Sequence, residues 1–197
     1  MARRVAYPVR ALCAVLLLFC VFGYPTENSA QPSSSSPTES QVKAAYLFNV
    51  GKFVRWQLNV PSGGNSFDIC ILGKNPFGGA LEATVAGESI DGKTIIARNI
   101  ASMQDAGHCR ILFISASEEG RLKAHLAAVR HMNALTVSDI PGFAEHGGMI
   151  GLVRQGGRIR FEVNVAPMGD AGLTVSSELL KVAIRVIGVE PAGGTGQ

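Results

Sequence analysis

Residues 149–165 carry the pattern of a β-hairpin that has one buried and one solvated face. A run rich in apolar residues, Met149–Val153, is followed by Gln155-Gly156-Gly157, and glycines at such a position supply the positive φ angles that hairpin turns need. Over Arg158–Val165 polar and apolar residues alternate with a period of two, which is typical of a strand with one face in the core. The polar side of that strand consists of Arg158, Arg160, Glu162 and Asn164. We interpret it either as an ordinary solvated face or as a contact surface for a partner.

Strand patterns and helical patterns alternate through the region that precedes the hairpin. Short buried strands are expected over Phe67–Leu72, Thr94–Ala97, Arg110–Ser115 and Ala134–Val137. A helix capped by Ser117 is predicted between the last two strands. Such alternation favours right-handed parallel crossovers. The sequence therefore predicts an α/β fold, in which a single domain has a mixed β-sheet with an antiparallel C-terminal hairpin and is flanked by helices.

Two further helices are expected at the ends of this domain. The first would have Ser40 as its N-cap and would carry an aromatic-rich face, which we interpret as core, with Tyr46, Phe53 and Trp56. The last would be capped by Ser176 or Ser177, and its inward-facing side chains would be those of Leu179, Leu180, Ala183, Ile184 and Ile187.

The first thirty residues have the organisation of a secretory signal peptide. Arginines cluster in the first ten residues, Ala11–Gly23 is an apolar segment, and Ser29-Ala30 offers small residues for cleavage. The apolar segment is shorter than the roughly 20 residues of a membrane span, and an uncleaved anchor is the alternative. We predict a signal peptide over residues 1–30, a flexible proline- and serine-rich linker over 31–40, a folded domain over 41–188 and a disordered tail over 189–197.

Charge and cysteine content narrow the classes of partner. The formal net charge is +3, and three arginines and one glutamate before Ala30 contribute 3 − 1 = +2, which argues against a broad nucleic-acid-binding surface on the rest. After export, Cys70 and Cys109 remain, and a disulfide is the default expectation in an oxidising compartment. Two buried free thiols are the alternative. A metal site is disfavoured, because only His108 lies beside either cysteine and no CxxC spacing exists.

The sequence holds no strong pattern of catalytic residues. Ser138 with His146 and either Asp139 or Glu145 could be imagined as a hydrolase triad, but the GxSxG turn that would present the serine is absent. Asp139 before Ile140-Pro141-Gly142 more naturally forms a side-chain turn. His125 and His131 are expected at the surface of the predicted helix that contains them. HExxH and GxxxxGK[ST] are also absent, so we predict no enzyme activity, no metal and no cofactor.

Several segments, in order along the chain, resemble the YfiR family. They are QVKAAYLFNVGKFVRW from residue 41, ILGKNPFG from 71, GHCRILFIS from 107, LTVSDIPGFAEHGGMI from 135, RIRFEVN from 158 and AGLTVSSELLKVA from 171. The resemblance implies a non-enzymatic periplasmic regulator that binds and represses the periplasmic sensor part of an inner-membrane diguanylate cyclase. Cyclic di-GMP and biofilm formation would be controlled in this way. It also implies an outer-membrane or peptidoglycan-anchored lipoprotein that sequesters the regulator.

The resemblance also bears on the cysteines. It supports a bridge between Cys70 and Cys109. The family's namesake carries a second cysteine pair in the region that matches Glu145–Leu152, and this sequence has none there. Any redox-sensing role attached to that second pair is therefore in doubt here.

Three surfaces are candidates for partner contacts. One is the polar strand face formed by Arg158, Arg160, Glu162 and Asn164. A second is the loop of Asp139, Phe143 and Glu145, in which an exposed Phe143 would be a natural anchor. The third is the aromatic face of the first helix, which could serve a homodimer. The alternative function is a periplasmic small-molecule-binding sensor module, with its ligand in a crevice at the carboxyl ends of the strands, that acts through another signalling partner.

Overall fold

The computed structural model describes residues 36–57 and 65–188. The predicted signal peptide, most of the predicted linker and the predicted tail lie outside the described residues and stay predictions. No helix within these two ranges combines the length and the apolar character that crossing a bilayer requires.

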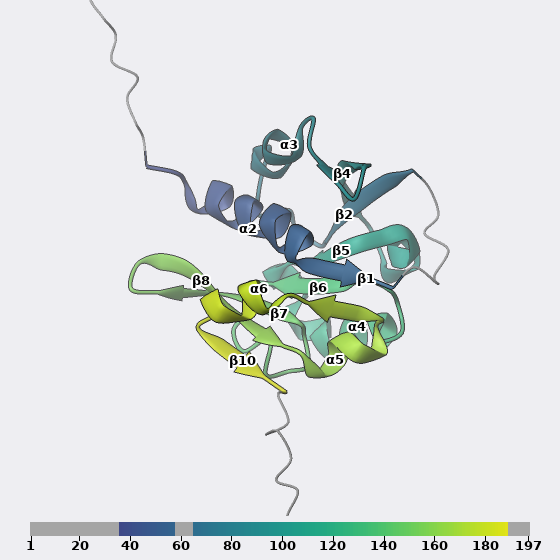
Figure 1. Ribbon diagram of the computed structural model, residues 1–197, viewed down its shortest axis with the longest axis vertical. Coiled ribbons are helices and arrows are strands. Elements are labelled where there is room, and N and C mark those ends of the chain that lie inside the picture. The colour runs from purple at the N-terminus through teal and green to yellow at the C-terminus, as the bar shows by residue number, and fades with distance from the viewer. Residues whose placement is uncertain (1–35, 58–64, 189–197) are drawn as a thin grey trace, which may run out of the picture. The chain divides into compact units, whose positions relative to one another are not determined.

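An eight-stranded mixed sheet is the centre of the domain (Figure 1). From one edge to the other, its strands are β10 (Arg185–Ile187), β8 (Arg158–Asn164), β7 (Ile150–Gln155), β6 (Leu135–Ser138), β5 (Cys109–Ile114), β2 (Ser66–Leu72), β4 (Lys93–Ile100) and β3 (Ser89–Ile90). The run from β4 through β7 is parallel, while β7 and β8 form the antiparallel hairpin. Gly156 and Gly157 turn that hairpin with φ angles of 56° and 74°. The predicted α/β fold is confirmed.

Helices cover both faces of this sheet, and the strands are apolar on both sides for that reason. In β2, Ile69 and Ile71 belong to one core cluster, which also contains residues of α2 (Glu39–Phe53) and α3 (Ala80–Val85). Cys70 and Leu72, which point to the other face, belong to a second cluster beneath α4 (Leu122–Val129). The core is thus split by the sheet into two layers.

Two helix starts differ from the sequence-based prediction. The N-cap of α2 is Thr38, which forms a capping box with Gln41, while the Ser40 hydroxyl donates to the Pro76 carbonyl at 3.1 Å. After β5 the chain first makes a 3-10 turn, η3 (Ala116–Arg121), whose N-cap is Ser115 rather than Ser117. A second 3-10 turn, η2 (Met103–His108), leads into β5.

The long C-terminal helix predicted from residue 176 is wrong beyond Val182. Here the chain forms α5 (Ala166–Asp170), β9 (Leu173–Val175), the short helix α6 (Ser177–Val182) and then β10. The Ile184 amide donates to the Phe161 carbonyl, which draws the chain into the sheet, and the Ile184 side chain is 41% exposed instead of facing inward. Of the predicted inward residues, Leu179 is buried.

A disulfide and a second, small sheet connect parts of the domain that are distant in the sequence. A disulfide joins Cys70 of β2 to Cys109 of β5, with their Cα atoms 5.8 Å apart, so the predicted bridge is confirmed. A separate two-stranded sheet pairs β1 (Val54–Trp56), which follows α2, with β9 in antiparallel register.

Candidate functional site

The loop after β6, residues 139–148, is fixed by backbone contacts at its start. The Ser138 hydroxyl donates to the Ile114 carbonyl at 2.6 Å and accepts from the Ile140 amide at 3.0 Å, and Ser138 is fully buried. A hydroxyl that makes these two hydrogen bonds connects β6 to β5 and is not accessible to a substrate. The structure therefore gives the imagined triad no exposed nucleophile.

The expectation that Phe143 is exposed is wrong. Its side chain is 1% exposed and belongs to the second core cluster. The ring occupies the space above Gly148, where an added Cβ would lie 2.1 Å from a ring carbon. Phe143 therefore anchors its own loop to the core and does not offer an apolar contact to a partner.

Asn164, predicted on the polar face of β8, also acts on this loop. It is 6% exposed, its amide nitrogen donates to the Ala144 carbonyl at 2.8 Å, and its oxygen accepts from the Ala166 amide at 3.1 Å. Because a buried amide group that loses its partners is costly, these bonds fix the loop against the end of β8. Asn164 is therefore a buried residue that holds the loop in position, and it is not itself a contact residue on the surface.

Arg185 joins two of the predicted surfaces. From β10, its guanidinium pairs with Glu145 of the loop and lies 3.8 Å from Glu162 of β8. The hydrogen bond with Glu145 raises the pKa of Arg185 above its ordinary value, which shows that the contact favours the charged form that arginine already has at physiological pH. Sequence reasoning missed Arg185 because it placed the residue in a helix.

Asp139, at the start of the loop, is held by an ion pair with α2. Lys43 of α2 lies 2.6 Å from Asp139 and 2.7 Å from Glu39, and its side chain is only 12% exposed. One oxygen of Asp139 is buried and has no hydrogen-bond partner within residues 36–57 and 65–188. The carboxylate is therefore a fixed part of the junction between α2 and the loop, with limited access from solvent.

The hairpin tip carries the free charges of the candidate surface. Arg158 and Arg160 are exposed, and the side chain of neither forms a hydrogen bond or an ion pair with another residue in the described ranges. Arg154 of β7 pairs with Glu39 of α2. Beside these three arginines is a hollow of about 440 Å³ between the hairpin and α2, with Tyr46 and Ile159 in its wall.

The aromatic face of α2 packs against this same hairpin and the sheet. The Tyr46 hydroxyl donates to the Ile159 carbonyl at 3.0 Å, and its ring lies edge-on to Phe161. Trp56, in β1, lies edge-on to Phe67. Phe53 is the exception, with 39% of its side chain exposed.

The histidines are scattered through the described residues. His125, expected at the surface, is buried, and its Nε2 lies 2.9 Å from Glu118, whose other partner is Arg121 at 2.6 Å. His131 is exposed at the end of α4, and His146 is exposed in the loop. His108 is 3.5 Å from Asp68 beside the disulfide. The burial of His125 could have been predicted from helical spacing, because His125 lies on the same face of α4 as the buried residues Leu122 and Val129.

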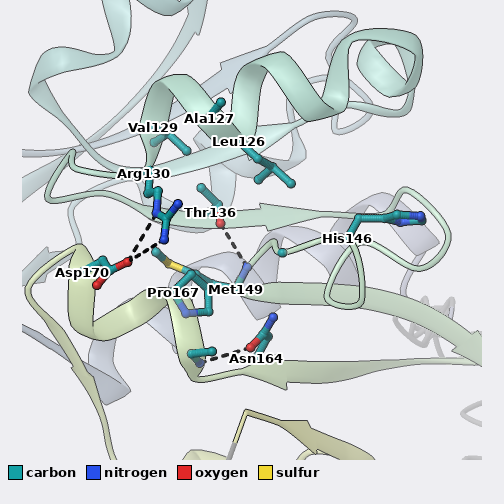
Figure 2. A pocket seen from close by; sticks show the side chains of 12 residues that line it. Leu126, Ala127, Val129, Arg130, Thr136, His146, Met149, Asn164, Pro167 and Asp170 are labelled. Carbon is teal, nitrogen blue, oxygen red and sulfur yellow. Dashed lines mark hydrogen bonds and ion pairs between the residues drawn. The ribbon is translucent and has the colours of Figure 1, made fainter.

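A pocket of about 370 Å³ lies between α4, α5 and the start of β7, and Figure 2 shows its lining. Arg130 and Asp170 form an ion pair at 3.3 Å across one end, and the imidazole of His146 lies at the other end. The Thr136 hydroxyl accepts from the Met149 amide at 3.1 Å. Apart from His146, these polar groups are already paired within the chain, so the pocket presents few free groups to a ligand.

The crevice expected at the carboxyl ends of the strands is closed between the parallel strands β2 and β5, where the order in which successive strands join the sheet reverses. The Ser115 hydroxyl donates to the Lys74 carbonyl at 2.6 Å, and the Lys74 amide donates to the Ser117 hydroxyl at 2.9 Å. A Cβ at Gly73 would lie 2.5 Å from the Ser117 hydroxyl, so the two loops are in contact. This position usually holds the ligand in open α/β sheets, and here it is filled by the chain itself.

Two solved structures are similar to this chain at low sequence identity. A conserved domain protein from Vibrio cholerae O1 biovar El Tor strain N16961 has a TM-score of 0.51 and 11% identity over 77% of this chain. The ABC domain in complex with L-Trp from Streptococcus pneumonia has a TM-score of 0.45 and 12% identity over 62% of this chain. The chain spans 61% and 56% of the lengths of those two proteins. At such identities, the first likeness shows the fold alone.

No curated protein matches the sequence closely enough to count as a relative. A family model does match: the YfiR/HmsC-like model aligns with residues 40–184, which is well over half of the chain and includes every strand of the main sheet except β10. That family is one of periplasmic regulators of diguanylate cyclase activity, and its members are regulatory and not catalytic. The segments that suggested the resemblance fall in α2 and β1, in strands of the main sheet, in the loops after β2 and β6, and in β9 and α6. This chain belongs to the YfiR/HmsC-like family.

Proposed function

We propose that this chain is a non-enzymatic periplasmic regulator that binds the periplasmic sensor part of an inner-membrane diguanylate cyclase and holds the cyclase inactive. Cyclic di-GMP and biofilm formation fall as a result. An outer-membrane or peptidoglycan-anchored lipoprotein competes for the regulator and releases the cyclase. The work of such a protein is a difference in affinity between partners, which requires an exposed recognition surface and no catalyst.

The observation that carries this proposal is that two neighbouring arginines near the hairpin turn, Arg158 and Arg160, have side chains without an ion-pair partner in the described ranges. Most charged groups around it are already matched: Asp139 by Lys43, Glu145 and Glu162 by Arg185, and Arg154 by Glu39. Arg158 and Arg160 are exposed and have no matching anion within the described ranges. A rigid strand that presents two free guanidinium groups suits a partner with acidic side chains, because arginine binds carboxylates through two parallel hydrogen bonds.

The predicted contact residues are therefore divided into two roles. We assign contact to Arg158 and Arg160, with Glu162 and Glu145 at the border of the surface. Asp139, Phe143 and Asn164 hold the loop in place. The exposed ring of Phe53 on α2 remains a candidate for a homodimer contact.

The proposal is tested in cells that contain the cognate cyclase. Deleting the gene should raise cyclic di-GMP, and the wild-type gene should restore the basal level. The Arg158→Glu/Arg160→Glu double variant should fail to restore it while being exported in equal amount. Lys123→Glu, an exposed charge reversal on α4, is the matched control and should restore the basal level.

Binding of the purified chain to the isolated sensor part gives a second measurement. We expect the double variant to lose about tenfold or more in affinity, which corresponds to roughly 1.4 kcal/mol. An unchanged cyclic di-GMP level after deletion would remove the regulatory role. A rise on deletion that the double variant reverses would leave the role but reject the arginine surface.

A small-molecule sensor module is the second candidate, and the pocket beside Arg130 and Asp170 is the observation that favours it. Its volume of about 370 Å³ falls within the range of small-ligand sites. A thermal-shift screen with metabolites checks it. A saturable rise in melting temperature that is lost in Asp170→Ala would favour this candidate over pure protein recognition.

A further inference from the structure

Three side chains with metal-binding atoms meet where β2 lies beside β5, and a fourth, Asp68, lies next to one of them. The ligand atoms of Cys70, His108 and Cys109 all lie within 4.8 Å of one another. Asp68 is adjacent, with one carboxylate oxygen 3.5 Å from Nε2 of His108. Two sulfurs, one imidazole and one carboxylate form a donor set that Zn²⁺ binds in tetrahedral sites.

The fold itself brings these residues together. Asp68 and Cys70 are two positions apart in β2, so their side chains lie on the same face of the sheet. Asp68 is the strand partner of Cys109 in the parallel pairing with β5. His108 is the last residue of η2 and comes directly before Cys109. Three neighbouring elements therefore fix the donor set independently of the bond between the sulfurs.

The carboxylate of Asp68 is incompletely matched. Asp68 is 5% exposed, and its Oδ1 has no hydrogen-bond partner among the described residues. Its Oδ2 is shared between Arg98 at 3.0 Å and His108. A buried carboxylate oxygen without a partner is costly, and coordination of a cation would relieve that cost. Arg98 is half-exposed, so its guanidinium can turn toward solvent when a metal takes its place.

We propose that the chain binds one Zn²⁺ through Cys70, Cys109, His108 and Asp68 when its disulfide is reduced. The disulfide and the metal are then alternative cross-links between β2 and β5. A dithiol supplies the two electrons: it transfers two hydrogen atoms to the protein sulfurs and itself becomes a cyclic disulfide. Zn²⁺ then binds the two thiolates and displaces two protons.

The spacing of the backbone suits both states. The Cα atoms of Cys70 and Cys109 are 5.8 Å apart in the bridged form. With Zn–S bonds of about 2.3 Å, both sulfurs can reach one ion after small changes in their side-chain angles. The strands need not separate, because their pairing continues beyond Cys109 to Ile114. Reduction in the presence of zinc therefore leaves the sheet cross-linked.

The test uses the purified full chain under anaerobic conditions, with and without a phosphine reductant, whose phosphorus is oxidised by taking oxygen from water. Zinc content is measured after desalting, and Co²⁺ serves as a spectroscopic probe. We expect one metal per chain in the reduced protein and none in the oxidised protein. Bound Co²⁺ should show the visible bands and the thiolate charge-transfer band of a tetrahedral site.

Variants separate this site from adventitious thiol binding. His108→Ala should weaken metal affinity about tenfold or more. His131→Ala, which alters another exposed histidine, should leave the affinity unchanged. Circular dichroism should show the reduced, metal-bound chain to be folded. Uptake equal in the oxidised form, no uptake by the reduced chain, or equal affinity of the His108→Ala and His131→Ala proteins would each overturn the proposal.

Discussion

Removal of the disulfide should lower the free energy of unfolding more than any surface substitution in this protein. Cys70 and Cys109 are 39 positions apart in the sequence. In the chain-entropy model, closing a loop of about 40 residues stabilises the folded state by roughly 4 kcal/mol at 25 °C. The Cys70→Ala/Cys109→Ala double variant removes the bridge without leaving a thiol. Both sulfurs are buried, so some packing is also lost.

Unfolding by urea and by heat, followed by circular dichroism in buffer with a metal chelator, measures this loss. A domain of this size loses about 2–4 °C of melting temperature per kcal/mol, so the variant should melt roughly 8–16 °C below the wild type. The urea midpoint should fall by about 2 M for an m-value near 2 kcal/mol/M. Val182→Ala, at a side chain that is 64% exposed, is the control and should change neither midpoint appreciably.

A loss below about 1 kcal/mol would refute the reasoning. It would mean that the unfolded chain already holds β2 and β5 close together, so the bridge removes little entropy. Reduction of the wild-type protein in the same chelating buffer should reproduce the loss seen in the double variant, because it opens the same loop.

Three further substitutions test the loop after β6. Phe143→Ala should lower the free energy of unfolding by about 3–5 kcal/mol in urea titrations, because it empties a fully buried ring site; a loss typical of a surface residue would return Phe143 to the contact list. Gly148→Ala should cost about 1–3 kcal/mol in the same assay, since the new methyl group would overlap the Phe143 ring, and an unchanged midpoint would show that the ring can move freely. Asn164→Ala should cost about 1–3 kcal/mol and speed proteolysis of the loop, because the Ala144 carbonyl and the Ala166 amide lose their partner; a loop equally resistant to protease would contradict that role.

Strands with a strong local pattern could be predicted from the sequence. The hairpin of β7 and β8 has alternating residues and a two-glycine turn, and β5 contains the apolar run Ile111–Ile114. In both cases the order of polar and apolar residues reflects which side chains of the strand are buried, so the local sequence is enough to predict the strand. The bridge between Cys70 and Cys109 was expected for an equally direct reason, since two cysteines remain after export and family resemblance supports their pairing.

Elements whose existence depends on distant neighbours could not be predicted. The strand β10 has three residues, and it forms because the backbone of Phe161 and its neighbours offers hydrogen bonds at the sheet edge. Residues 183–187 by themselves continue a helical apolar spacing, which favoured the wrong assignment. Because these residues were assigned to a helix, the contacts of Arg185 with Glu145 and Glu162 could not be predicted either.

The candidate site shows the same division. The exposure of Arg158 and Arg160 follows from alternation in one strand, and the sequence shows it directly. The burial of Phe143 depends on the gap above Gly148, five residues later in an irregular loop, where no periodicity applies. Asn164 has the correct parity for the polar face, but the loop covers its end of the strand.

The pairing of β1 with β9 makes assembly of this domain a late and slow event. Val54 and Val175 are strand partners although 121 positions (175 − 54) separate them. Bringing together points so far apart costs roughly 4 kcal/mol in chain entropy before any contact repays it. A nascent polypeptide that lacks its last quarter has no partner for β1, and the ring of Tyr46 on α2 has no Phe161 to pack against, so these parts stay uncovered until the C-terminal elements are made. Chaperone dependence during export and slow refolding in vitro are the expected consequences.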